Sequence, residues 1–204
     1  MALLSVAIAT ARTLLNDDVA AVWTDASLLP KAQEAHRELQ VKLWKAGSPV
    51  VRKQSDPITV LAHATTITSP NDLLAPTAVV EYAATVETLA DATEMTESTY
   101  LPRLAEGTKL RFWSWKGETF EVLPASVDRK VVVYYRKLIT VPTATSDPIG
   151  VIFGELYIGA RVAAMVHGSV GNVEAFNIIS QVAATNFDDV IMVNRGRQMP
   201  GEKP

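Results

Sequence analysis

The three histidines of this chain are the first candidates for metal binding or proton transfer. His36, His63 and His167 lie on separate segments, and none has a second ligand at the spacing of a metal site. His36 falls on the charged side of a predicted helix, which favours a solvated side chain. The chain contains no cysteine, which excludes cysteine-ligated zinc, thiol catalysis and disulfides. The sequence therefore predicts no metal and no cofactor.

Two glycine motifs resemble phosphate-binding or nucleophile motifs but lack required residues. Gly154 and Gly159 have the spacing that opens a phosphate-binding loop, yet Ala160 and Arg161 stand where Lys-Ser or Lys-Thr is needed. Their place inside a predicted helix indicates close packing against a neighbouring helix instead. The segment 168–171 lacks the glycine spacing of a nucleophile elbow and connects two predicted helices.

Two pairs of adjacent aspartates, Asp17–Asp18 and Asp188–Asp189, could act as an acid and a base. Catalysis would need apolar surroundings that raise the pKa of one carboxyl group, and the neighbouring sequence offers none. Solvated helix ends are the favoured interpretation. An enzyme of unfamiliar type, with Asp188, Asp189 and His167 as its site, stays open as an alternative class.

Aromatic residues near position 113 could form a surface for base stacking. Trp113 and Trp115 alternate with Phe112, and Arg111 and Lys116 flank them. Because alternate residues of a strand point to the same face, both tryptophans are predicted to meet the core. A single-stranded nucleic-acid-binding module is kept as a less favoured alternative.

The composition is that of an ordinary globular protein. The chain has 204 residues, of which 48% are hydrophobic and 20% charged, with a formal net charge of −3. This length suits one domain, or a core with a substantial insertion, and the charge provides no general attraction to nucleic acid or membranes. No apolar run reaches the roughly 18 residues of a membrane span. The N-terminal segment is predicted to form an amphipathic helix, since no basic residue precedes its apolar part as in a signal peptide.

The segment 24–47 is predicted to be a long surface helix around which the chain is organised. Thr24 and Asp25 can cap its start, Pro30 is expected to begin its regular part, and Gly47 can close it in the left-handed region. Glu38 and Lys42 are spaced for an ion pair on its outward face. Its buried stripe is expected to comprise Leu28, Ala32, Ala35, Leu39 and Leu43.

The remaining pattern predicts two helices, a block of strands and two further helices. Asp147 and Pro148 are expected to cap and begin the third helix. The segment 88–102 is expected to be a loop. The helices are expected at 3–15, 24–47, 147–167 and 173–194, and the strands at 49–51, 57–61, 79–88, 110–115, 119–123 and 130–138.

The predicted fold class is α+β, with N- and C-terminal helix pairs packed as a helical bundle and an antiparallel β module inserted between them. Residues 1–47 and 147–194 would form the helical domain. Residues 48–146 would form the inserted β domain, and residues 195–204 an extended C-terminal tail.

Several segments resemble the head-to-tail adaptor proteins of tailed bacteriophages. The segment 11–40 is similar to the opening of that family, in which an Ala-Arg-x-Leu-Leu-Asn helix precedes Trp-x-Asp-x-x-Leu-Leu and a long helix. Related proteins often end in a more arginine-rich strand than this chain does. Further similar segments are 71–74, 110–117, 131–135 and 152–161.

The resemblance implies a structural virion protein and no enzyme. Copies would form a ring, typically of twelve, beneath the portal at the capsid–tail junction, after synthesis in the host cytoplasm. Genomic DNA would pass through the channel, a tail or stopper protein would dock below, and no membrane would be involved. A tail-completion or stopper protein of the phage neck is the alternative within virion proteins.

Three sets of contact residues follow as expectations. The charged outer face of the organising helix suits packing against another subunit, and the polar tail suits the portal. The hairpin turn suits the next tail component. The sets are Arg37, Val41 and Lys45 for the subunit interface, Arg195, Arg197, Gln198, Met199 and Pro200 for the portal, and Trp115, Lys116 and Gly117 for the tail side.

Overall fold

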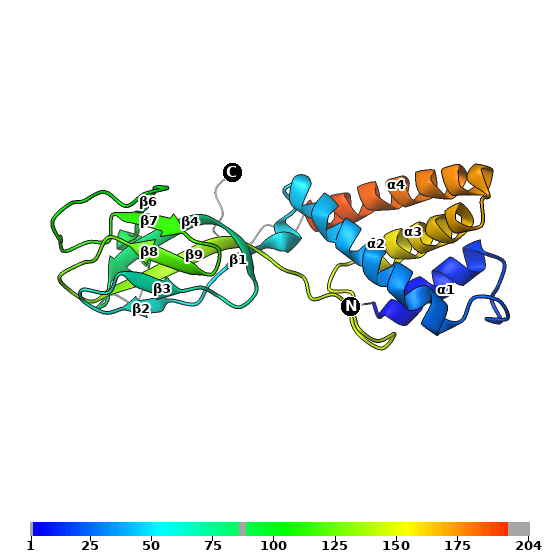
Figure 1. The fold of residues 1–204 in the computed structure, drawn as a ribbon, viewed down its shortest axis with the longest axis horizontal. Coiled ribbons are helices and arrows are strands. Elements are labelled where there is room, and N and C mark those ends of the chain that lie inside the picture. The colour runs from blue at the N-terminus through cyan, green and yellow to red at the C-terminus, as the bar shows by residue number, and fades with distance from the viewer. Residues whose placement is uncertain (1, 86–88, 196–204) are drawn as a thin grey trace. The chain divides into compact units, whose positions relative to one another are not determined.

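A computed structural model describes residues 2–85 and 89–195 of the chain (Figure 1). It divides into two compact units, of which the first comprises Met1–Val51 and Ile139–Pro204 and the second Arg52–Leu138. The first unit, called unit 1 below, contains the helices. Its elements are α1 (Leu4–Leu14), α2 (Asp25–Lys45), the 3-10 helix η1 (Pro49–Val51), α3 (Gly154–Ser169) and α4 (Val173–Arg195).

Helix α3 packs against α1, α2 and α4, so the other helices of unit 1 meet on it. Gly159 lies directly against α1, and a Cβ atom there would lie 2.7 Å from Thr10 Cβ and 2.8 Å from the carbonyl oxygen of Ala7. No side chain fits in that space. The prediction that the α3 glycines serve helix packing is confirmed at this position.

Helix α2 begins earlier than the sequence pattern predicted. The Thr24 side chain accepts a hydrogen bond from the Ser27 amide, as predicted for a cap, and the Leu28 amide donates to the Thr24 carbonyl. A helical turn is therefore complete before Pro30, so the expectation that regular helix starts at Pro30 is wrong. Gly47 has a φ of 65°, which confirms the left-handed end. The predicted stripe is buried in full, at Leu28, Ala32, Ala35, Leu39 and Leu43.

The third helix starts later than predicted. Asp147 was expected to cap a helix beginning at Pro148, but α3 starts only at Gly154. The Asp147 carboxylate instead accepts hydrogen bonds from the Ala144 and Thr143 amides, which lower its pKa. These bonds close a turn before the expected helix, so the same side chain that could cap a helix stabilises a loop.

Unit 2 contains nine strands in two sheets within the described residues (Figure 1). In the five-stranded sheet the order is β1-β9-β4-β5, and β2 also pairs with β9. Its strands are β1 (Arg52–Gln54), β2 (Ile58–Val60), β4 (Leu73–Ala83), β5 (Thr93–Glu94) and β9 (Arg129–Lys137). In the four-stranded sheet the order is β3-β8-β7-β6, with strands β3 (Thr66–Thr68), β6 (Thr96–Glu97), β7 (Phe112–Trp115) and β8 (Thr119–Val122). A short 3-10 helix, η2 (Leu89–Asp91), precedes β5.

One hydrophobic core in unit 2 takes side chains from both sheets. Both sheets therefore bury one face in the same interior. The five-stranded sheet contributes Val60, Val79, Val131, Val133 and Tyr135, and the four-stranded sheet contributes Ile67, Trp113, Phe120 and Val122.

The predicted fold class, a terminal helical bundle with an inserted antiparallel β module, is wrong. The described chain forms four helices and two sheets of nine strands, and β6 pairs with β7 in parallel. Residues 88–102, predicted to be a loop, contain β5 and β6. Each of these strands is two exposed residues long, so pairing rather than an apolar pattern makes them strands. Residues 49–51, predicted to be a strand, form the 3-10 helix η1.

An ion pair is buried in the five-stranded sheet. The Arg129 guanidinium on β9 donates through Nε to Glu81 Oε2 on β4 at 2.6 Å, and both side chains are buried. A charged group in this position depends on its partner, because water cannot replace the interaction.

Replacing Glu81 by alanine should therefore destabilise the protein strongly. The variant leaves Arg129 as a buried cation with no ion pair, and we expect a loss of about 3–5 kcal/mol in the free energy of unfolding. The matched control is Glu121→Ala, which removes the exposed Lys116–Glu121 pair at 3.7 Å and should cost less than about 1 kcal/mol. Urea denaturation followed by tryptophan fluorescence measures both. Equal losses in the two variants would contradict the assignment.

Candidate contact surfaces

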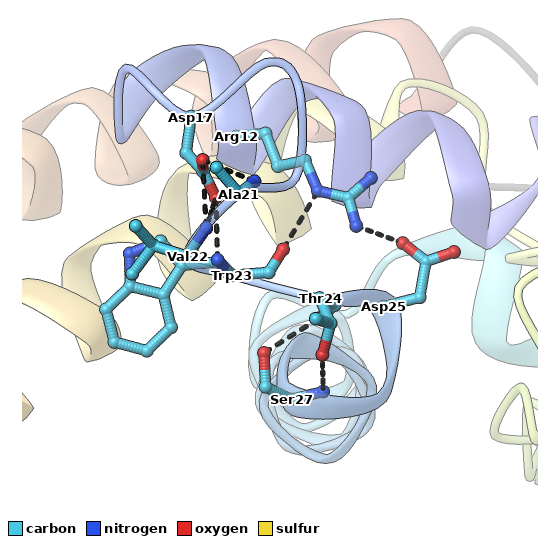
Figure 2. Close-up of polar contacts among 8 residues, drawn as sticks. All are labelled: Arg12, Asp17, Ala21, Val22, Trp23, Thr24, Asp25 and Ser27. Atoms are coloured by element: carbon cyan, nitrogen blue, oxygen red, sulfur yellow. Dashed lines mark hydrogen bonds and ion pairs between the residues drawn. The ribbon is translucent and has the colours of Figure 1, made fainter.

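The loop between α1 and α2 is organised by the carboxylate of Asp17, as Figure 2 shows. Its oxygens accept hydrogen bonds from the backbone amides of Ala21, Val22 and Trp23, the shortest of which, 2.6 Å, comes from Trp23. The Trp23 amide does most to lower the pKa of Asp17, against the opposing effect of burial. Asp17 is buried, so the predicted solvated helix end is wrong at this position.

Arg12 and Thr24 complete the same loop (Figure 2). Arg12 Nε donates to the Trp23 carbonyl at 3.1 Å, and the Arg12 guanidinium forms an ion pair with Asp25. These contacts join the end of α1 to the start of α2. Arg12, Asp17, Trp23 and Asp25 all belong to the segment 11–40 that resembles the opening of the adaptor family, and in this chain they build local structure.

The predicted subunit contacts Arg37, Val41 and Lys45 lie together on one exposed face of α2. They border a shallow hollow on that helix. Arg37 and Lys45 have no ion-pair partner in the part of the chain that the structure describes. The hollow is lined by Glu34, Arg37, Glu38, Val41, Lys42 and Lys45.

Glu38 and Lys42 do not form the ion pair that their spacing predicted. Glu38 accepts two hydrogen bonds from Arg161 on α3, at 2.6 and 3.0 Å, and these raise the pKa of Arg161. Lys42 Nζ instead lies 5.1 Å from the ring centroid of Tyr157 on α3 and 5.4 Å from that of Phe187 on α4. Burial raises the pKa of Tyr157 to about 12. Glu38 and Lys42 therefore join helices within unit 1, unlike Arg37 and Lys45.

The two tryptophans of the β7–β8 hairpin differ in burial. Trp113 is buried and donates from Nε1 to the Met95 carbonyl at 3.3 Å, which confirms its predicted place in the core. Trp115 is half-buried and packs on Phe120 with a centroid distance of 4.7 Å. With Trp113 buried and Trp115 half-buried, the two tryptophans do not form the exposed base-stacking surface that the nucleic-acid alternative needs.

The predicted tail-side residues lie at the turn of this hairpin. Gly117 has a φ of 88°, a backbone conformation that residues with a side chain rarely adopt and that suits a hairpin turn. The neighbouring Lys116 Nζ donates to the Thr99 carbonyl at 3.3 Å and lies 5.7 Å from the centroid of the Tyr100 ring. Tyr100 is 82% exposed, so the turn and its neighbour present an aromatic ring and a cation to solvent.

An open cleft of about 610 Å³ in unit 2 escaped the sequence analysis. Within it, the Asp72 carboxylate accepts hydrogen bonds from Lys53 Nζ at 2.8 Å and from the Tyr135 hydroxyl at 2.6 Å. Burial by itself would raise the pKa of Asp72, but the hydrogen bonds from Lys53 and Tyr135 outweigh it, and the pKa is lowered. Both carboxylate oxygens are thus used internally, and the cluster holds β1, β9 and the start of β4 together. The sequence offered one signal for this cluster: Asp72 lies in the segment 71–74, which is similar to the adaptor family.

The structure places His36 and His63 in different surroundings, and the prediction for His36 is wrong. His36 is buried, and its Nε2 lies 2.9 Å from the Ile149 carbonyl oxygen, so the predicted solvated side chain is wrong. His36 lies on the same flank of α2 as the buried Ala32 and Ala35, next to the charged face. His63 pairs with Glu106 at 2.8 Å. Within the described residues, no group of three His, Cys, Asp or Glu side chains could hold a metal ion.

The residues of the enzyme alternative are not brought together. His167 lies near the end of α3, where the neighbouring Gly168 faces Phe176 at the start of α4. Asp188 and Asp189 lie toward the opposite end of α3, where Asn186 donates to the Leu156 carbonyl. Both aspartates are exposed on α4, without the dry surroundings that acid–base catalysis needs.

Of the predicted portal contacts, Arg195 is the last residue of α4, and Arg197, Gln198, Met199 and Pro200 lie outside the described residues. No helix in the described ranges combines the length and apolar character of a membrane span.

Comparison with known families assigns the chain. The model of the SU10 adaptor protein family matches residues 1–198. The chain belongs to the SU10 adaptor protein family. The resemblance to phage adaptor proteins is thereby confirmed, and the family is one of structural adaptor proteins of bacteriophages, located in the virion neck. A search of curated proteins returned no match.

The buried His36 should make stability depend on pH. Burial lowers its pKa below the ordinary value near 6.5, because the charged ring loses water. The unfolded chain then binds a proton more readily than the folded chain, so this part of the stability is present above about pH 6.5 and is lost as the pH falls toward the folded pKa. Urea denaturation at pH 7.5 and 5.5 should show the loss in the wild type.

His36→Gln can keep the hydrogen bond to the Ile149 carbonyl and should lose less stability between those two pH values. The matched control is His63→Gln, which should keep the pH dependence of the wild type, because His36 is intact. A wild-type dependence that survives in His36→Gln would refute the role of His36.

Proposed function

We propose that this protein is a head-to-tail adaptor that forms a ring between the portal and the tail and encloses the DNA channel. The observation that carries the proposal is the match of the adaptor family over residues 1–198. The charged, exposed faces of α2 and α4 suit lateral contacts between copies, and the net charge of −3 avoids strong attraction to passing phosphates. We infer a non-enzymatic role and a ring of twelve subunits.

Electron microscopy of the protein mixed with its portal tests this proposal. Closed rings seated on one end of the portal, with an open centre, are the expected result. Binding without rings, or a plug that closes the channel, would favour a stopper or tail-completion protein.

The segment 195–204 is the proposed portal contact, because it is polar and contains two prolines in ten residues. A chain truncated after Asn194 should bind the portal more weakly, by on the order of tenfold or more. Surface plasmon resonance on immobilised portal measures the difference from the full chain. Normal affinity of the truncated chain would remove this segment from the contact.

The hairpin turn is the proposed contact with the next tail component. Lys116→Glu reverses the exposed cation beside Tyr100 and should reduce tail attachment about tenfold. Rings should still form, because the contacts of Lys116 with Thr99, Tyr100 and Glu121 all lie within unit 2. Lys109→Glu, at another exposed position of unit 2, is the matched control. Counting tailed particles after assembly in vitro provides the measurement, and attachment equal to that of the control would exclude the turn.

A further inference from the structure

Helix α4 carries a second apolar stripe on the side opposite to its buried one. Ile178, Val182 and Met192 are 57%, 40% and 67% exposed. With Thr185 and Asp189 they recur at steps of four, three, four and three, which aligns them in one seam along the helix. We call this seam the α4 outer face. An apolar seam exposed on a surface helix indicates a partner, and within the described residues nothing covers it.

The charges of α4 favour a partner of opposite charge. Between Val173 and Asn194 the helix carries Glu174, Asp188 and Asp189 and no lysine or arginine. Neither aspartate has an ion-pair partner in the described chain. Packing two α4 outer faces against each other would bring carboxylates from both copies and no cation to pair with them.

The face of α2 that lines the shallow hollow has the complementary character. Val41, 44% exposed, stands between Arg37 and Lys45 on successive turns. We call these three residues the α2 outer face. Its two cations have no ion-pair partner among the described residues, whereas Glu38 and Lys42 beside them already join α3 and α4.

The two outer faces lie on different sides of unit 1. Phe187 marks the flank of α4 that faces α2, since Lys42 lies over its ring. The helical positions of Ile178, Val182 and Asp189 turn away from that flank. One chain therefore cannot pair its own two faces, and each copy offers both to its neighbours. Such a head-to-tail contact closes into a ring or continues as a filament.

We propose that the α4 outer face of one copy packs on the α2 outer face of the next, with Asp189 of that face and Asp188 at its edge paired to Arg37 and Lys45. The contact rests on the proposed ring function and specifies how its subunits meet. The exposed apolar residues of both faces would be removed from water, and the four unpaired charges would acquire partners.

Disulfide trapping tests the contact, because the chain contains no cysteine of its own. One copy carries Val41→Cys and a second copy of different length carries Val182→Cys. Mild oxidation should give at least about tenfold more mixed dimer than Ala184→Cys paired with Val41→Cys, since Ala184 is exposed on the other side of the same helix. A yield no higher than that of the Ala184 control would overturn the proposal.

Charge reversal tests whether the aspartates of α4 pair with the cations of α2. Two double variants reverse the charges: Asp188→Lys/Asp189→Lys and Arg37→Glu/Lys45→Glu. When either one is introduced into both copies of the trapping pair, the yield of cross-linked dimer should fall about tenfold. Cross-linking should be restored when the Val182→Cys copy carries the two aspartate-to-lysine changes and the Val41→Cys copy carries Arg37→Glu/Lys45→Glu. If the trapping pair that carries Arg37→Glu/Lys45→Glu cross-links as well as the pair without these changes, Arg37 and Lys45 do not form the proposed ion pairs.

The trapping result is separable from the proposed function. Cross-links at the predicted positions without rings on the portal would leave the contact intact and reject the ring. Rings on the portal without these cross-links would support the ring and reject this contact.

Discussion

The structure of unit 1 depends on the burial of α3. Nine of the sixteen residues of this helix are buried, on nearly every side. A helix with so little polar surface cannot face water, so other helices must cover it. Because α1 and α2 precede the strands and α4 follows α3, burying α3 brings the two ends of the chain together. Gly159 permits the close contact between α3 and α1, since α1 occupies the place of its missing side chain.

Covering α3 uses one face of each surrounding helix and leaves another face exposed. On α2 the buried stripe faces the core, while Arg37, Val41 and Lys45 face water. On α4 one side of the helix is buried, and Ile178, Val182 and Met192 are exposed on the opposite side. The same packing that stabilises unit 1 thus decides which side chains remain available to other proteins, as an adaptor requires.

Charged side chains fall into two groups according to their partners. Arg12 with Asp25, Glu38 with Arg161 and Glu81 with Arg129 hold elements of one chain together. Their removal is expected to act on folding, most strongly where the pair is buried. Arg37 and Lys45 on α2 and Asp188 and Asp189 on α4 have no ion-pair partner among the described residues, and the proposed contact between copies would use them, since complementary charge governs rate and specificity.

Local patterns in the sequence correctly predicted several local features: the cap at Thr24, the five-residue stripe of α2, the left-handed Gly47 and the β7–β8 hairpin. Each depends on side chains within a few residues of one another, so local physics suffices. Family membership was also recognisable, from the segment 11–40 together with the further similar segments. The places of Asp17, His36, Asp72, β5 and β6 were decided by tertiary structure.

The buried polar residues show why. A carboxylate such as Asp17 is solvated or buried according to whether a loop folds back to donate its amides. His36 is accessible or buried according to how closely the segment around Ile149 approaches. The sequence by itself determined which helices and strands are possible and to which family the chain belongs. Tertiary structure decided which polar groups are enclosed and which faces remain exposed, because burial and pairing depend on segments that are distant in the chain.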